Sequence, residues 1–153
     1  MIYAANITIP ANTPAINPTL KRLPVTEGLI YKLEIEFPPG PEGTAHIIIY
    51  DGSSPVWPSN PGIDFASDAY TISFDDTYLK TRPPFEFQIY GFNTDTENEH
   101  SIQIRLGIVS KDIFIARFLP SYTYKHLEAL MAKMEAEEKE RARQILAKPF
   151  SWL

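Results

Sequence analysis

The chain has 153 residues, and its hydrophobic content of 44% suits a globular core and excludes wholesale disorder. Its formal net charge of -5 argues against a nucleic-acid-binding protein and against attachment to an anionic membrane, because both require basic surfaces. The absence of cysteine excludes disulfides, cysteine-ligated zinc and thiol nucleophiles. Without a secretion signal or an apolar run of membrane length, we expect a soluble protein made in a cytoplasm.

The first part of the sequence predicts strands joined by rigid turns. We expect an edge strand over residues 2–10. Residues 10–24 contain four prolines and predict an extended arm, since proline disfavours helix. The clearest strand covers residues 28–37, where alternation predicts one wet and one buried face. Its apolar row is Leu29, Tyr31, Leu33, Ile35 and Phe37.

Further alternating segments follow over residues 45–50, 70–74, 85–92, 101–109 and 112–118. The segment 101–109 is the most regular of these, with Ile102, Ile104, Leu106 and Ile108 on one face. About eight short strands at this spacing predict a mainly β protein, an antiparallel β-sandwich of jelly-roll type. We assign residues 1–119 to this domain, with the proline-rich segment as its arm.

The pattern changes after Pro120, and residues 120–153 are assigned to a C-terminal helix and a hydrophobic tail. Residues 121–148 lack glycine and proline and are rich in good helix formers. The apolar stripe of the helix ends at Met134, and the stretch 135–144 is too polar to pack on an apolar surface. We therefore predict that the apolar residues after it bind a partner subunit or particle: Ile145, Leu146, Phe150, Trp152 and Leu153.

The best candidate for chemistry is the polar segment 93–100, which holds Asn93, Asp95 and His100 between two predicted strands. Its alternating oxygen ligands resemble the start of an EF-hand, but neither possible register supplies the required Gly and Glu. A hairpin tip is the favoured interpretation. On it, no metal or other cofactor is expected.

No catalytic residues are assigned. His46, His100 and His126 lie in three separate elements, and Asp75 and Asp76 are expected to begin a turn. Trp57 lies among prolines and leaves two interpretations open. It is either a platform on which a sugar or a protein docks, or a ring that covers the end of the sandwich; the second is favoured.

Five segments together resemble a group of small, mostly uncharacterised β-rich proteins of bacteriophages and related mobile elements. The segments are 7–14 (ITIPANTP), 28–30, 37–40 (FPPG), 57–61 (WPSNP) and 93–100. The resemblance extends from about residue 7 to residue 109 and leaves the helix uncovered. It implies a virion structural protein, and it implies that Asn93, Asp95 and His100 form a structural turn.

The leading hypothesis is therefore a non-enzymatic capsid decoration or minor particle protein, located in the virion, that acts through subunit contacts. Its expected partners are copies of itself, as in a trimer, and a capsid or other particle protein. The alternative is a carbohydrate-binding or adhesion module that uses Trp57. An enzyme with a dispersed site is the third hypothesis and the least favoured.

Overall fold

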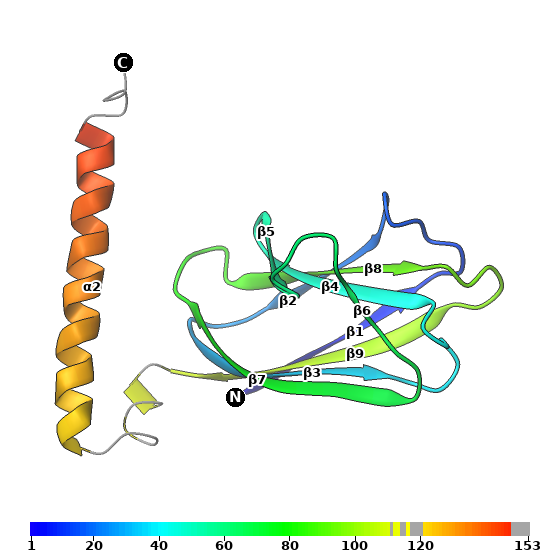
Figure 1. Ribbon diagram of the computed structural model, residues 1–153, viewed down its shortest axis with the longest axis horizontal. Helices are drawn as coiled ribbons and strands as arrows, with labels where there is room; N and C mark the ends of the chain where they lie inside the picture. The colour runs from blue at the N-terminus through cyan, green and yellow to red at the C-terminus, as the bar shows by residue number, and fades with distance from the viewer. Residues whose placement is uncertain (111, 114–115, 117–120, 148–153) are drawn as a thin grey trace. The chain divides into compact units, whose positions relative to one another are not determined.

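The computed structural model describes residues 1–110, 112, 113, 116 and 121–147. The chain divides into two compact units, Met1–Ser110 and Lys111–Leu153. The first is a β-sandwich, and the second carries the long helix α2 (Ser121–Ala147) (Figure 1). The division falls at residue 110 and not at 119. The strand expected over residues 112–118 is wrong, because Asp112, Ile113 and Ala116 are helical.

Nine strands lie in the described part of the chain and form two antiparallel sheets. One sheet has the order β1-β9-β3-β7, and the other has the order β2-β8-β4-β5, with β6 also paired to β4. The strands are β1 (Ile2–Ile9), β2 (Thr19–Pro24), β3 (Gly28–Phe37), β4 (Ala45–Asp51), β5 (Ser54–Trp57), β6 (Phe65–Ala66), β7 (Tyr70–Lys80), β8 (Glu86–Asn93) and β9 (His100–Val109).

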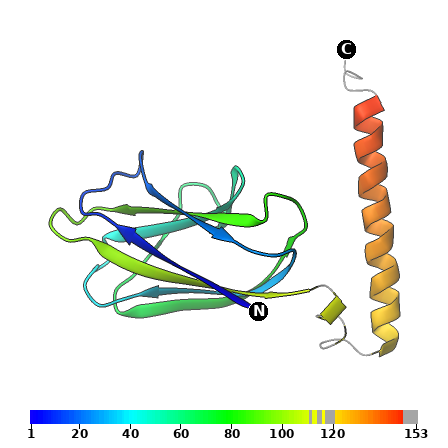
Figure 2. The same ribbon diagram turned by 180° about the vertical axis from the view of Figure 1, so that it is seen from behind.

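The strand pairs are nested. β1 pairs with β9, β2 with β8, β3 with β7, and β4 with β5 and β6, so the chain behaves as one long hairpin folded over itself. The folded hairpin gives two stacked layers, as the two opposite views show (Figures 1 and 2). This connection pattern is that of a jelly roll, and the predicted mainly β sandwich followed by a helix is confirmed.

The core lies between the two sheets and is built from inward residues of seven strands, β1 to β5, β8 and β9. Every second residue of β9 from Ile102 to Ile108 is fully buried, which confirms the predicted row. Isoleucine dominates because its branched side chain fits the pleated inner face of a sheet. The side chains without exposed surface are Ile9, Ile30, Leu33, Ile35, Ala45, Ile47, Ile49, Phe87, Ile89, Ile102, Ile104, Leu106 and Ile108.

A β-bulge corrects the row predicted for β3. The register against β9 shifts between Ile30 and Lys32, so Tyr31 is an extra residue in the strand. Before the bulge Ile30 is the buried residue, and Leu29 and Tyr31 are only half-buried. The Tyr31 ring covers Gly107 of β9, where a Cβ would meet the ring at 2.6 Å. An added residue changes which face the side chains point to, and simple alternation cannot detect it.

The proline-rich segment does not form a free arm. Asn12 donates its backbone N–H to the carbonyl of Asp95 at 2.7 Å, and Thr13 forms a bridge with Asn93. Residues 19–24 then form β2 at the edge of the second sheet, on β8. Proline is tolerated at this position because an edge strand needs fewer backbone donors.

We predict that Leu33→Ala and Ile104→Ala each lower the free energy of unfolding by about 2–5 kcal/mol, because each leaves a cavity in a fully buried site. Leu79→Ala is the matched control, since the same atoms are removed from a side chain that is exposed on β7. Urea unfolding followed by circular dichroism gives the three values. Equal losses for all three variants would contradict the assignment of the inward faces.

Candidate functional site

The β8–β9 connection is built around the buried side chain of Asn93. Its amide nitrogen lies within hydrogen-bond distance of three carbonyl oxygens, those of Asn98 at 2.9 Å, Pro10 at 3.3 Å and Ile9 at 3.5 Å. Its side-chain oxygen accepts the backbone N–H of Asp95 at 2.9 Å. One side chain therefore joins the end of β1, the end of β8 and the loop before β9.

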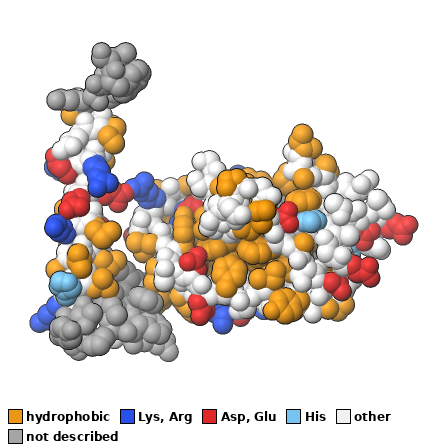
Figure 3. Space-filling model, in the orientation of Figure 1, with side chains coloured by type: hydrophobic (Ala, Val, Ile, Leu, Met, Phe, Trp, Pro, Cys, Tyr) orange, Lys and Arg blue, Asp and Glu red, His pale blue; other side chains and the backbone are white. Residues whose placement is uncertain are grey.

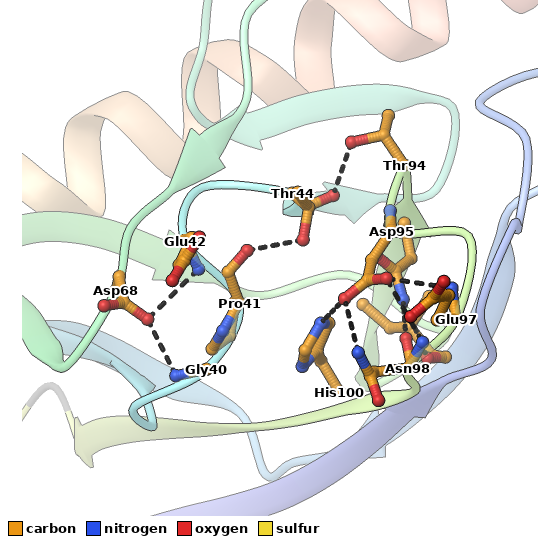
Figure 4. A network of polar contacts seen from close by, with 12 residues as sticks. Gly40, Pro41, Glu42, Thr44, Asp68, Thr94, Asp95, Glu97, Asn98 and His100 are labelled. Atoms are coloured by element: carbon orange, nitrogen blue, oxygen red, sulfur yellow. Dashed lines mark hydrogen bonds and ion pairs between the residues drawn. The ribbon is translucent and has the colours of Figure 1, made fainter.

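Asp95 organises the rest of the same loop (Figure 4). Its Oδ1 accepts the backbone N–H groups of Glu97 at 2.9 Å and Asn98 at 3.2 Å. Its Oδ2 lies 2.9 Å from Nε2 of His100, which is buried. This is an aspartate turn closed by a histidine, and it matches the predicted structural role of Asn93, Asp95 and His100.

The hydrogen bonds to Asp95 change its acidity. The backbone N–H of Glu97, then the side chain of His100 and the N–H of Asn98, lower the pKa of the Asp95 carboxyl to about 2. The ionised form is thus favoured by the native loop. Both carboxylate oxygens are engaged within the loop, so the pair with His100 serves the fold and is not free to transfer a proton to a substrate.

Two neighbouring turns complete this end of the sandwich (Figure 4). Thr94 donates its backbone N–H at 2.9 Å to the carbonyl of Thr44. Asp68 accepts the N–H groups of Gly40 at 2.8 Å and Glu42 at 3.1 Å. In the described residues, no three His, Asp or Glu side chains are grouped so that they could hold a metal ion.

Trp57 is a core residue and not a docking platform. Only 3% of its surface is exposed, and its ring packs against Tyr78 and Phe87 with centroids 5.5 and 5.2 Å away. Its Nε1–H donates to Oδ2 of Asp76 at 2.7 Å. A sugar needs an exposed aromatic face, so the platform hypothesis for Trp57 is wrong. The predicted turn at Asp75 and Asp76 is also wrong, because both lie within β7.

A partly buried cluster of Asp51, Tyr78 and Lys80, in which Lys80 is fully covered, was not predicted from the sequence. Nζ of Lys80 donates to Oδ1 of Asp51 at 2.5 Å, and the Tyr78 hydroxyl donates to Oδ2 at 2.7 Å. Burial, with Asp51 as the second cause, raises the pKa of Tyr78 to about 12. Lys80 is 2% exposed, so a substrate cannot reach its amine as nucleophilic catalysis requires. The end of β4 and the end of β7 are too far apart in sequence to reveal the cluster.

The solvent faces of the two sheets differ in chemistry. On the first sheet Arg105 donates to Glu34 at 2.8 Å and to Glu36 at 2.6 Å, in a polar network across β3 and β9. On the second sheet the outward positions of β4 and β8 include one aliphatic and three aromatic side chains, Ile48, Tyr50, Tyr90 and Phe92. In Figure 3, acidic side chains mark the end of the sandwich that carries the β8–β9 loop, and hydrophobic ones gather nearer its middle.

Comparisons with known proteins give no family and a distant structural match. No protein-family model matches the chain, and no curated protein matches its sequence. Among solved structures, a protein of the disulfide-linked pili that form Bacillus endospore appendages matches with a TM-score of 0.39 and 10% identity, over 72% of this chain and 88% of that one. So distant a likeness carries no argument about function.

The C-terminal candidates fall partly within the described residues. Ile145 and Leu146 lie in the last turn of α2, with 67% and 79% of their surfaces exposed. Phe150, Trp152 and Leu153 lie outside the described residues. Within the described part of the chain, no helix is long and apolar enough to cross a membrane.

We predict that Asp51→Ala lowers the free energy of unfolding by about 3–5 kcal/mol, because it leaves the Lys80 ammonium buried without its carboxylate. The double variant Asp51→Ala, Lys80→Met should recover much of this loss. Asp75→Ala is the control, as an exposed carboxylate on β7. Chemical unfolding of the four proteins provides the values. A double variant no more stable than Asp51→Ala would contradict the importance of the unpaired charge.

We also predict a pH dependence that Asp95 controls. A pKa lower in the folded than in the unfolded state gives stabilisation that is complete above about pH 4. This stabilisation is lost as the pH falls toward about 2. The urea midpoint of Asp95→Asn should therefore fall less between pH 5 and pH 2 than that of the unmodified protein. Glu97→Gln, at an exposed carboxylate of the same loop, should keep the full decrease. Parallel profiles for all three proteins would exclude this role of Asp95.

Proposed function

We propose that this chain is a non-enzymatic assembly protein, a jelly-roll subunit that associates with copies of itself through α2. The observation that carries the proposal is the apolar side of this 27-residue helix. At 100° per residue, Leu127, Leu130, Met134 and Ile145 fall on one side of α2. Met134 is 65% exposed, and Leu130 and Ile145 are also exposed.

The apolar side of α2 would gain stability from a surface to pack on. Most helical stability in proteins comes from packing an apolar face, and an isolated helix is marginal without it. The middle of the same side carries the charged residues Glu138 and Arg141, so the apolar surface of α2 is not continuous along the helix. A second copy of α2 offers an apolar surface on which the two ends of this side can pack.

The finer proposal is a decoration or minor protein of a virus particle, located in the virion. Two observations support it: the sequence resemblance over residues 7–109, and a jelly-roll topology, which is common in capsid proteins but also in lectins and cupins. On this proposal the tail from Ile145 to Leu153 contacts the particle or a neighbouring subunit. Capsid and portal genes beside this one, and the chain itself in purified particles by mass spectrometry, would support it.

We predict that the full chain has a mass of two or more monomers in size-exclusion chromatography with light scattering. The double variant Leu130→Glu, Met134→Glu should shift the protein to monomer, because it places charge on the proposed contact. The matched control is Ala129→Glu, Ala136→Glu, which adds the same charges on the opposite side of α2.

The unfolding transition of the sandwich should stay unchanged in both double variants, since each substitution lies in the second unit. A monomeric unmodified protein at micromolar concentration would overturn assembly through α2. So would equal oligomer masses for the two double variants.

A further inference from the structure

The outer face of β4 and β8 holds a cavity of about 500 Å³. Ile48 and Tyr50 of β4 and Tyr90 and Phe92 of β8 line it, and we call these four residues with Asp64 the aromatic groove. The alternation of each strand places these side chains outside, because their neighbours Ile47, Ile49 and Ile89 are buried in the core. Ala15, Pro18 and residues of the segment 52–62 form its other walls.

The rings of the groove are held in place by contacts with other aromatic side chains. Tyr50 and Tyr90 meet edge to face, with centroids 5.2 Å apart and planes at 81°. Phe92 stacks on His46, with centroids 4.3 Å apart and planes at 2°. All four are half-buried and stand on paired strands. A flat ligand therefore meets rings that need little ordering when it binds.

The polar part of the groove is acidic. Oδ1 of Asp64 lies 2.7 Å from Nδ1 of His46, which fixes the carboxylate. Its Oδ2 accepts no hydrogen bond from any residue that the structure describes, and it remains available as an acceptor. The described residues that line the cavity include no lysine or arginine. These features disfavour phosphates, acidic sugars and other anions, which need cationic partners.

The backbone around the groove disfavours a peptide added as a strand. β8 is paired on both sides, by β2 and β4, and β4 is paired by β8 on one side and by β5 and β6 on the other. Strand addition needs an unpaired edge, and neither strand offers one. The cavity volume of about 500 Å³ instead falls in the range of small-molecule binding sites.

We propose that the aromatic groove binds a neutral saccharide. The C–H face of a pyranose packs on the exposed ring surface of Tyr50, Tyr90 or Phe92, and its hydroxyls donate to the carboxylate of Asp64. A pyranose has an apolar C–H face and hydroxyl groups around its edge. The aromatic rings of the groove match this face, and the oriented carboxylate of Asp64 matches the hydroxyls. The proposal goes beyond assembly through α2, because the groove is complete within the sandwich.

The test is a glycan array that carries neutral, sialylated and sulfated saccharides, probed with the full chain. We expect binding to neutral glycans. Isothermal titration with the best neutral oligosaccharide should then show about a ten-fold or greater loss of affinity in Tyr90→Ala and in Asp64→Asn. Tyr70→Ala is the matched control, since Tyr70 is an exposed tyrosine of the other sheet. It should bind as tightly as the unmodified protein.

Circular dichroism melts show whether each variant is folded, and Asp64→Asn alone decides the test if Tyr90→Ala is not. Absence of binding to every neutral saccharide overturns the proposal, and so does binding that survives both Tyr90→Ala and Asp64→Asn. Preference for sialylated or sulfated glycans, or for a proline-rich peptide on a parallel array, also overturns it. Light scattering on the same samples reports assembly separately, so the two proposals fail independently.

Discussion

The end of the sandwich at the β8–β9 loop depends on the hydrogen bonds of the Asn93 side chain. Three strands end or begin there: β1 ends at Ile9, β8 ends at Asn93 and β9 begins at His100. A buried carbonyl without a donor is costly, so a buried amide must supply what the ladder cannot. Asn93 does this for the end of β1 and for the loop before β9. The position of Asp95 follows, since the Asn93 oxygen holds its N–H.

The solvent-facing sides of the two sheets carry different types of side chain. The ion pairs of Arg105 with Glu34 and Glu36 keep the first sheet hydrated and add little stability, because exposed pairs are screened by water. The second sheet presents rings at the corresponding outward positions. Nothing in the packing of the core demands this difference, since both sheets bury equivalent aliphatic rows on their inner faces.

Sequence patterns were sufficient for the regular strands and insufficient where the chain departs from regularity. The alternation in residues 101–109 identified β9, and the polar composition of the segment 93–100 identified a hairpin connection; the turn role of Asn93, Asp95 and His100 came from the family resemblance. The bulge at Tyr31 was missed, since one extra residue leaves no signature in composition. β2 was missed because proline suppressed the strand signal, although an edge position tolerates it.

The remaining errors concern contacts between distant segments. Trp57 lies near Asp76 only because β5 and β7 meet across the sandwich, and Lys80 finds Asp51 in the same way. The aromatic groove likewise combines residues of β4 and β8 with Asp64, and the first and last of these, Ile48 and Phe92, are 44 residues apart in sequence. Patterns of neighbouring residues do not predict contacts between segments so far apart. The segment 112–118 was misread for a different reason, as apolar residues at alternate positions also occur on helices.

The position of β9 in its sheet determines when that sheet can be completed during synthesis. Within the described residues, β1 lies at the edge of its sheet and pairs there with β9, which in turn pairs with β3. β1 therefore cannot join its sheet until β9 has been made. The pairing of β3 with β7 does not need β9, so the four-stranded sheet is completed only after residue 109 has been synthesised.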